Sequence, residues 1–354
     1  MNWQALKYLT AYLLPLTVAI SLTSEGWLSF LPLLYSFGFI PLLELAVGPQ
    51  LSQLSPAQKA LAKEDRLYDW LLYLMAPLMF IFIFWYGQAV QSLAFTDSTF
   101  WGRTLGLGLL CGVIGINVGH ELGHRTTGWE QRLAKILLTS SLYTHFFIEH
   151  NYGHHRNVAT PEDPATARYN ETLYAFWWRS IVNSYRHAWQ IQRKMLLGKK
   201  VRFFSLKNHM LLFHVGHLFL LLALVVTFGS FALAGYLIAA LIGIVLLESV
   251  NYIEHYGLAR KKVSAKRYEN TTPVHSWNSN HLIGRLVLFE LSRHSDHHAN
   301  PHKKYQTLQS YLHSPQLPTG YPGMIILAFV PPLWFALMNR RIQGLHGHAQ
   351  GEMA

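Results

Sequence analysis

Six apolar stretches, each long enough to cross a lipid bilayer as a helix, constrain this chain more than any other feature. A helix needs roughly 20 apolar residues to span the hydrocarbon core. Only 13% of the residues are charged, which is about half the share carried by soluble domains. The sequence therefore predicts an all-α integral membrane protein. Its six transmembrane helices are expected near residues 8–24, 27–47, 68–89, 101–122, 210–228 and 231–252.

The remaining segments predict a cap on this bundle. A seventh apolar stretch, 324–338, is shorter and contains Pro331-Pro332, so it predicts a re-entrant or interfacial segment instead of a span. The polar stretches 125–208 and 256–354 are too long for simple connections, and we expect them to fold as helices that cap the bundle. The whole chain, 1–354, is thus expected to form one membrane domain.

The basic residues predict which side of the membrane the cap occupies. If the N-terminus is cytosolic, every Lys and Arg except Arg103 lies on the cytosolic side, as the positive-inside rule requires. The net charge of +11 is then concentrated on one face, where it favours anionic lipid or an acidic protein partner. No nucleic-acid recognition module accompanies this charge, so nucleic-acid binding is not expected.

Histidine is unusually frequent, because the chain has 20 histidines and a single cysteine, Cys111. One cysteine excludes an intrachain disulfide, a Cys-based zinc site and an internal iron–sulfur domain. Four motifs stand out: HELGH at 120–124, HNYGHH at 150–155, NYIEHYG at 251–257 and HSDHH at 294–298. They contain nine candidate metal ligands: His120, His124, His150, His154, His155, His255, His294, His297 and His298.

The spacing of these histidines predicts that their imidazoles converge. Residues four apart share a helix face, so three pairs are each expected to aim at one point: His120 with His124, His150 with His154, and His294 with His298. His155 and His297 are expected to reach a second metal nearby. One tetrahedral zinc takes only three or four protein ligands, so nine histidines predict two metal ions. All-imidazole ligation suits iron, zinc, copper and nickel alike.

Two other interpretations use the motifs less completely. HELGH also matches the zinc-protease pattern, in which Glu121 would be the general base, but that function leaves the other seven histidines unused. A metal transporter would place its histidines along a path across the membrane, whereas these motifs gather at one face.

The motifs and their flanking residues resemble the membrane alkane monooxygenase (AlkB) family, within the wider group of membrane fatty acid desaturases and hydroxylases. Desaturases usually have three histidine motifs, so the NYIEHYGL element favours the alkane hydroxylases. The resemblance covers nearly the whole chain. Its strings are HELGHR at 120–125, FFIEHNYGHHRNVATPEDPATAR at 146–168, NYIEHYGL at 251–258, HSWNSNH at 275–281, RHSDHHA at 293–299 and LPTGYPG at 317–323.

This resemblance implies two non-haem iron ions held by the nine histidines, O2 as oxidant, and hydroxylation of the terminal methyl of a medium-chain alkane. It also implies rubredoxin as electron donor, with rubredoxin reductase and NAD(P)H upstream. The implied location is the bacterial inner membrane, with the metal site on the cytoplasmic side. A fatty-acyl desaturase or hydroxylase, or an aromatic-methyl (xylene-type) monooxygenase, is the alternative. The chain departs from the family pattern at Glu290, Ser292 and His302 without losing a ligand.

Carboxylates within or beside the motifs are candidates to accept the second N–H of a ligating imidazole. They are Glu121, Glu149, Asp163, Glu248, Glu254 and Asp296. Four nearby histidines are expected to lie outside the ligand set: His145, His275, His281 and His302. An alkane partitions into the bilayer, so the substrate is expected to enter between helices. Side chains of residues 35–40 in the second span are expected to set how long a chain fits.

Overall fold

The computed structural model describes residues 3–265 and 267–351, and within them the fold is almost entirely helical. Five continuous helices in this part of the chain are long and apolar enough to cross a membrane. Helices are the expected solution because backbone N–H and C=O groups have no water partners in lipid. These five helices are Gln4–Thr23, Gly26–Val47, Arg66–Val90, Ser98–Gly123 and His209–His255.

The first four of these helices contain the first four predicted spans, and each is assembled from shorter regular pieces. Two pieces, η3 and η4, are π-helical, and η1 and η2 are 3₁₀-helical. In chain order the pieces are η1 (Trp3–Tyr12), α1 (Leu13–Thr23), η2 (Gly26–Phe30), α2 (Leu31–Leu34), η3 (Tyr35–Phe39), α3 (Ile40–Val47), α5 (Arg66–Tyr73), α6 (Met75–Val90), α7 (Ser98–Leu110), η4 (Cys111–Val118) and α8 (Gly119–Gly123).

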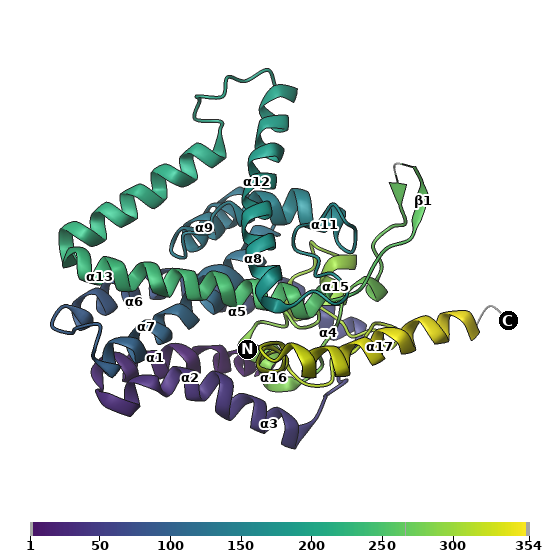
Figure 1. Cartoon of the computed structure of the whole chain (residues 1–354), viewed down its shortest axis with the longest axis horizontal. Helices are drawn as coiled ribbons and strands as arrows, with labels where there is room; N and C mark the ends of the chain where they lie inside the picture. The colour runs from purple at the N-terminus through teal and green to yellow at the C-terminus, as the bar shows by residue number, and fades with distance from the viewer. Residues whose placement is uncertain (1–2, 266, 352–354) are drawn as a thin grey trace.

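The fifth helix, α13 (His209–His255), carries both of the remaining predicted spans. Its 47 residues are interrupted at Gly229, whose φ of 84° lies in the region that glycine tolerates best. Figure 1 shows the two limbs of α13 meeting in a sharp V. The bend lies at the same end of the bundle as the turn after α1 and the loop after α6, and α8, α11 and α15 lie toward the other end (Figure 1).

Close packing of α13 against α7 and η4 relies on small residues. A Cβ added to Gly243 would come within 2.5 Å of Cys111 Cβ, and one added to Gly108 would come within 2.6 Å of Ile242. Membrane helices approach this closely only where side chains are small. The second limb of α13 is thereby held against the span that carries the HELGH motif.

Arg103, the one basic residue outside the charged face, has a local structural explanation. Its side chain is buried and donates hydrogen bonds to the carbonyl oxygens of Ser21 (3.3 Å), Ala89 (2.6 Å) and Ser24 (2.9 Å). Carbonyls in the last turn of a helix lack intrahelical donors. The guanidinium therefore caps the ends of two neighbouring spans, which explains its position near the turns.

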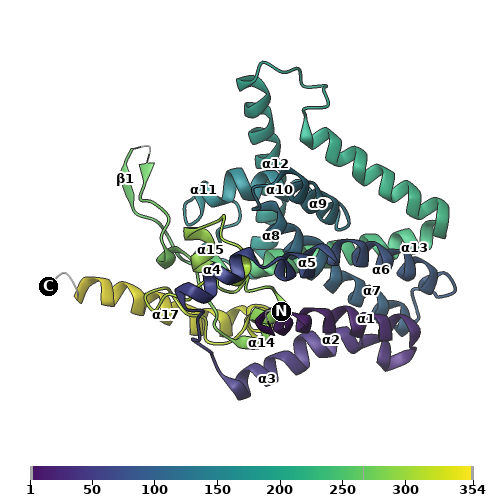
Figure 2. The same ribbon diagram turned by 180° about the vertical axis from the view of Figure 1, so that it is seen from behind.

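The two polar stretches fold over one end of the bundle, together with the short helix α4 (Pro56–Glu64) (Figures 1 and 2). They are mostly helical as predicted, but the second also forms a small exposed antiparallel hairpin that we did not predict. The stretch at 324–338 is divided between two helices, with Pro331-Pro332 at the start of the second. The elements are α9 (Gly128–Thr139), α10 (Phe146–Glu149), η5 (His150–His154), α11 (His155–Asn157), α12 (Leu173–Gly198), β1 (Lys262–Ser264), β2 (Arg267–Tyr268), η6 (Pro273–His275), α14 (Leu282–Val287), α15 (His294–Ala299), η7 (Tyr305–Thr307), α16 (Tyr321–Ala328) and α17 (Pro331–Gly351).

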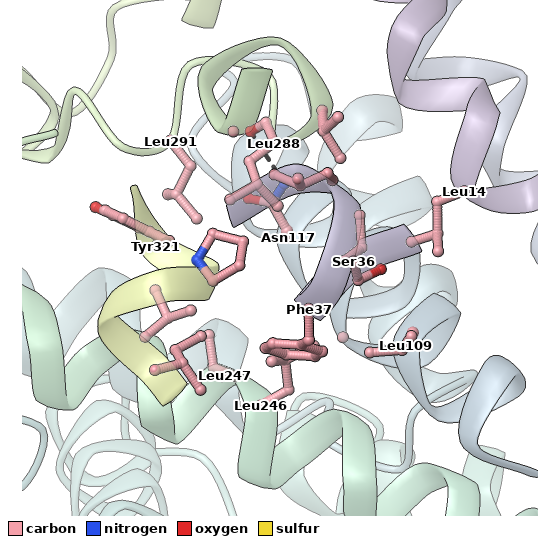
Figure 3. A pocket seen from close by; sticks show the side chains of 18 residues that line it. Leu14, Ser36, Phe37, Leu109, Asn117, Leu246, Leu247, Leu288, Leu291 and Tyr321 are labelled. Carbon is pink, nitrogen blue, oxygen red and sulfur yellow. Dashed lines mark hydrogen bonds between the residues drawn. The ribbon is translucent and has the colours of Figure 1, made fainter. Parts of the chain in front are cut away.

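An apolar pocket lies between the spans and the cap (Figure 3). Its walls come from the first, second, fourth and fifth membrane helices, from α14 and the turn after it, and from α16. Leucine, valine, isoleucine and phenylalanine dominate the lining, and the polar exceptions are Ser36, Asn117 and Tyr321. Such a pocket suits an unfunctionalised hydrocarbon, because few side chains in it can form a hydrogen bond with a polar group.

Candidate metal centre

The nine histidines of the four motifs lie together beneath the cap and fall into two groups. The five-histidine group contains His120, His124, His150, His155 and His297. The four-histidine group contains His154, His255, His294 and His298. In each group the facing nitrogens all lie within 4.8 Å of one another.

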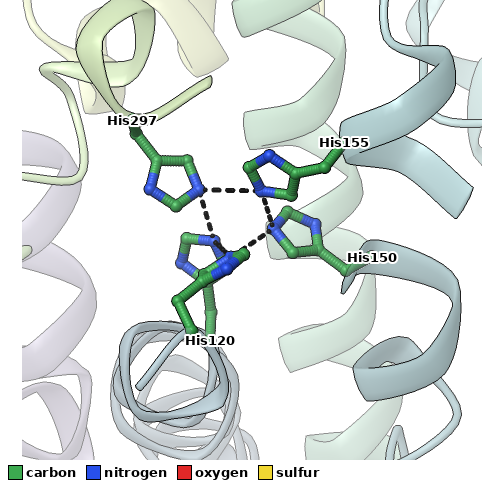
Figure 4. Close-up of side chains that lie close together, drawn as sticks. His120, His150, His155 and His297 are labelled. Atoms are coloured by element: carbon green, nitrogen blue, oxygen red, sulfur yellow. Dashed lines mark hydrogen bonds between the residues drawn. The ribbon is translucent and has the colours of Figure 1, made fainter. Parts of the chain in front are cut away.

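In the five-histidine group the Nε2 atoms form a closed ring, part of which Figure 4 shows. Successive neighbours around the ring are 3.0 to 3.2 Å apart. The ring runs from His120 to His297, His155, His150, His124 and back to His120.

Hydrogen bonds alone cannot satisfy this ring. In a neutral imidazole, one given nitrogen is either a donor or an acceptor. Donors and acceptors would therefore have to alternate around the ring, and a ring of five cannot alternate. One cation that accepts all five lone pairs satisfies every nitrogen. The spacing also fits, because two nitrogens about 2.1 Å from one metal and at right angles lie about 3.0 Å apart.

The four-histidine group forms an open row. Its Nε2 separations are 3.2 Å from His154 to His298, 2.8 Å from His298 to His294, and 3.2 Å from His294 to His255. These separations also match adjacent donors on one ion. The donor sets of both groups therefore fit a metal.

The division into two groups corrects one predicted pair. We expected His150 and His154 to share a point, but they lie in different groups, and His150 instead pairs with His155. His150–His154 forms a π-helical turn, η5, and this wider turn brings His155 onto the face of His150. The pairs His120/His124 and His294/His298 each converge as predicted. His297 belongs to the five-histidine group, whereas the next residue, His298, belongs to the four-histidine group.

Burial keeps these imidazoles neutral, which is the form that binds metal. In the cap, burial is the main cause that lowers the pKa of His124, His150, His155, His294 and His298 well below the usual value, and neighbouring histidines lower it further. Burial also lowers the pKa of His297, to about 3.

His154 behaves differently because of Asp163. Burial lowers the pKa of His154, but the carboxylate of Asp163, 2.9 Å from Nδ1, outweighs that effect and the net pKa is raised. Asp163 also accepts hydrogen bonds from the Thr166 hydroxyl and the backbone N–H of Ala165. Its carboxylate therefore orients the His154 ring so that Nε2 faces the four-histidine group, the arrangement usual behind a metal-bound imidazole.

The other five candidate carboxylates have different surroundings. Glu254 approaches His294 at Nε2 (3.2 Å), on the side that faces the group. The remaining four pair with residues outside the nine histidines: Glu121 with Arg125, Glu149 with His187, Glu248 with Tyr143, and Asp296 with Lys303. Their contacts therefore support the cap and the spans instead of holding a histidine of either group.

The four histidines expected outside the ligand set join neither group within the described residues. His275 pairs with Glu269, His281 contacts Ser279, and His302 lies against the carbonyl of His124 at 3.3 Å. His145 is buried against Tyr143 and Tyr185.

Sequence reasoning missed two features around the histidines. Glu290 forms a buried ionic cluster with Arg285 (2.7 Å) and Arg293 (3.3 Å) just before His294. Tyr321 lines the apolar pocket and donates a hydrogen bond of 2.6 Å to Glu254. The string LPTGYPG contains Tyr321 and marked its segment, but it did not indicate this contact.

The apolar pocket adjoins the histidine groups through short connections. Asn117 and Leu291, which line it, lie three residues before His120 and His294, respectively. The pocket wall (Figure 3) and the two histidine groups therefore share these two segments of the chain.

Comparison with known proteins agrees with this arrangement. Residues 98–328 match the fatty acid desaturase family. An alkane 1-monooxygenase of Alcanivorax borkumensis is 39% identical over 96% of this chain and 85% of its own length. The chain belongs to the alkane 1-monooxygenase family. An alkane 1-monooxygenase of Pseudomonas putida is 39% identical over 92% of the chain and 81% of its own length. The xylene/toluene monooxygenase hydroxylase component of the same organism is 31% identical over 68% of this chain and 63% of its own length.

Proposed function

We propose that this chain is an integral-membrane alkane 1-monooxygenase that hydroxylates the terminal methyl of medium-chain alkanes with O2 and holds two non-haem iron ions. The observation that carries the proposal is the apolar pocket that adjoins two convergent histidine groups. The relatives named alkane 1-monooxygenase support the substrate class.

In this proposal each histidine group holds one iron. When bound, the irons supply the activation of O2 and the oxidation of a C–H bond. The chain contributes position and exclusion of water. The five- and four-histidine groups fix the two sites, Asp163 orients His154, and the leucine-rich walls of the pocket present a terminal methyl while keeping bulk water away.

The membrane arrangement belongs to the same proposal. We infer that α13 crosses twice, once on each side of Gly229, so that the spans number six. The histidine groups then face the cytoplasm across the bacterial inner membrane, in agreement with the basic residues of the cap. Accessibility labelling of single cysteines placed at Ser230 and at Ser264 tests this topology, since the two should react from opposite sides.

Product analysis tests the activity most directly. The purified full chain, supplied with iron, rubredoxin, its reductase and NADH, should convert octane or dodecane to the primary alcohol. The similarity to the xylene/toluene monooxygenase component supports aromatic-methyl hydroxylation as the second candidate. Assays with xylene and with a fatty acid distinguish these activities, and oxidation of the aromatic or acyl substrate alone would replace the alkane proposal.

The proposed docking place of the electron donor, rubredoxin, is formed by three hollows on the cap, each of which is lined in part by His302. One hollow is lined by Lys63, Arg66 and Lys304, and a second by Lys59 and Lys303, with His302 on both. A third hollow, also lined by His302, reaches His124 and His155 of the five-histidine group. An acidic carrier is attracted to such a surface and is brought close to one metal site.

Reversing three basic charges around the first two hollows should slow electron delivery. In the triple variant Lys59→Glu, Lys63→Glu, Arg66→Glu, stopped-flow mixing with reduced rubredoxin at low salt should give an association rate lower by about tenfold or more. The deficit should shrink in high salt because salt screens exposed charges. Lys199→Glu, Lys200→Glu, Arg202→Glu makes the same charge change in the loop after α12 and should leave the rate near wild type. Equal rates in the two triple variants would place the donor elsewhere.

Removing the charge of Asp163 should weaken one metal site selectively. Asp163→Asn replaces the carboxylate beside His154 Nδ1 with a neutral amide, so iron affinity of the four-histidine group should fall by about 10- to 100-fold. Iron titration followed by elemental analysis measures this change. Asp296→Asn is the matched control, because Asp296 is buried among the same motifs but faces Lys303 and Tyr311. If Asp163→Asn bound iron as wild type does, the role assigned to Asp163 in orienting His154 would be wrong.

A further inference from the structure

Glu254 differs from the other acidic residues near the histidines in the atom that it approaches. It lies at the end of α13, directly before His255, and is 1% exposed. Its Oε2 is 3.2 Å from Nε2 of His294, the same nitrogen that faces His255 and His298. Asp163, in contrast, meets its histidine at Nδ1, on the outer side of the ring.

This oxygen lies beside an inner nitrogen of the row, that of His294. Neighbouring Nε2 atoms in the four-histidine group are 2.8 to 3.2 Å apart, and the Glu254 oxygen lies at the same interval from His294. The carboxylate therefore adjoins the group through His294, while the four nitrogens are the atoms that all lie within 4.8 Å of one another. Carboxylate oxygen and imidazole nitrogen are ligands that non-haem iron commonly takes together.

Among the described residues, Glu254 has His294 and Tyr321 as its polar contacts and no cation of fixed charge beside it. Three other buried acids near the motifs pair with cations, whereas Glu248 does not: Glu290 with two arginines, Glu121 with Arg125, and Asp296 with Lys303. No lysine or arginine of the described residues forms an ion pair with Glu254. A buried carboxylate without a compensating charge is costly, and a metal ion in the adjacent group supplies that charge.

Tyr321 fixes the orientation of this carboxylate. Its hydroxyl donates to Oε1 at 2.6 Å, which leaves Oε2 turned toward the histidines. The same tyrosine lines the apolar pocket. One side chain therefore contacts both the carboxylate and the space proposed for the substrate.

We propose that Glu254 is an oxygen ligand of the metal held by the four-histidine group, and that Tyr321 is the positioning residue that aims it. This inference rests on the proposed function, in which both groups hold iron. It adds one carboxylate to an otherwise all-imidazole centre and makes the two metal sites chemically unequal.

Iron binding to the full-length protein in detergent tests this assignment. Glu254→Gln keeps the shape of the side chain and removes its charge, so one of the two irons should bind at least about tenfold more weakly. In ⁵⁷Fe Mössbauer spectra, one iron signal should shift or vanish while the other keeps its parameters. Tyr321→Phe should shift the same signal by a smaller amount, because the ligand stays but loses its orientation.

Glu248→Gln is the matched control. Glu248 is a second buried carboxylate on α13, and it also accepts a tyrosine hydroxyl, that of Tyr143, at 2.8 Å. It forms no ion pair with a histidine of either group among the described residues. Iron content and both Mössbauer signals should match wild type in this variant.

Thermal melts of the iron-free proteins separate ligation from folding. Without iron, Glu254→Gln should be about as stable as wild type, since glutamine keeps the shape of the side chain and an acceptor for the Tyr321 hydroxyl. Added iron should then stabilise it less than wild type, because stabilisation follows binding affinity. Two irons with unchanged affinity and spectra in Glu254→Gln would overturn the inference. A wild-type protein that binds no iron would instead overturn the proposed function itself.

Discussion

Replacing His297 with alanine should remove one of two irons and lower alkane hydroxylation by at least about 100-fold. His297 Nε2 lies 3.0 Å from His120 and 3.1 Å from His155 in the five-histidine ring. Its loss opens the ring and removes a donor from a buried site that no other described histidine can reach. Changing even an outer partner of a metal ligand costs 10- to 100-fold, so a direct ligand should cost more. Elemental analysis and product formation measure the two effects.

The neighbouring residue makes this prediction specific. His298 belongs to the other group, so His298→Ala should also leave one iron, but with the complementary spectrum. His313→Ala removes an exposed histidine from a nearby turn and should change neither iron content nor turnover. If His297→Ala kept both irons, the division of the nine histidines into two sites would be wrong.

Enlarging Ser36 to phenylalanine should shift the product range toward shorter alkanes. Ser36, Phe37 and Ile40 contribute the second span to the pocket wall, within the segment expected to set chain length. A phenyl group there occupies space otherwise filled by methylenes. Each methylene excluded from an apolar site costs about 0.8 kcal/mol, or about fourfold in affinity. If the phenyl group excludes three methylenes, the affinity for the longest substrate should fall by about 60-fold.

Competition between alkanes measures this shift. Octane and hexadecane supplied together give a product ratio that is independent of enzyme amount and of electron delivery. Leu42→Phe introduces the same phenyl group on the same span, at a side chain that is 68% exposed and lies outside the pocket. Its ratio should equal that of wild type. An unchanged ratio in Ser36→Phe would show that the chain lies elsewhere.

Hydropathy and motif spacing predicted much of this architecture because both follow from local rules. The apolar windows located all five long helices, and the positions of the nine histidines predicted that they would converge. The interruption of α13 lay at Gly229, between the fifth and sixth predicted spans, where a glycine permits a positive φ. The hairpin at 262–268 escaped prediction because its residues lack an apolar alternation.

The features that the sequence did not predict depend on a local distortion of a helix or on contacts distant in sequence. His150 pairs with His155 because five residues form a π-helical turn, and no residue pattern predicts that turn. The position of Arg103 made sense only once carbonyls from two other helices lay beside it. The contact of Tyr321 with Glu254 joins residues 67 positions apart.

The paired histidines at 154–155 and 297–298 have a mechanical consequence. In each pair, neighbouring residues contribute to different groups. Consecutive Cα atoms are a fixed 3.8 Å apart across a trans peptide. Two dipeptides therefore tie the two groups together through the backbone. A backbone shift at either dipeptide moves a histidine of each group at once.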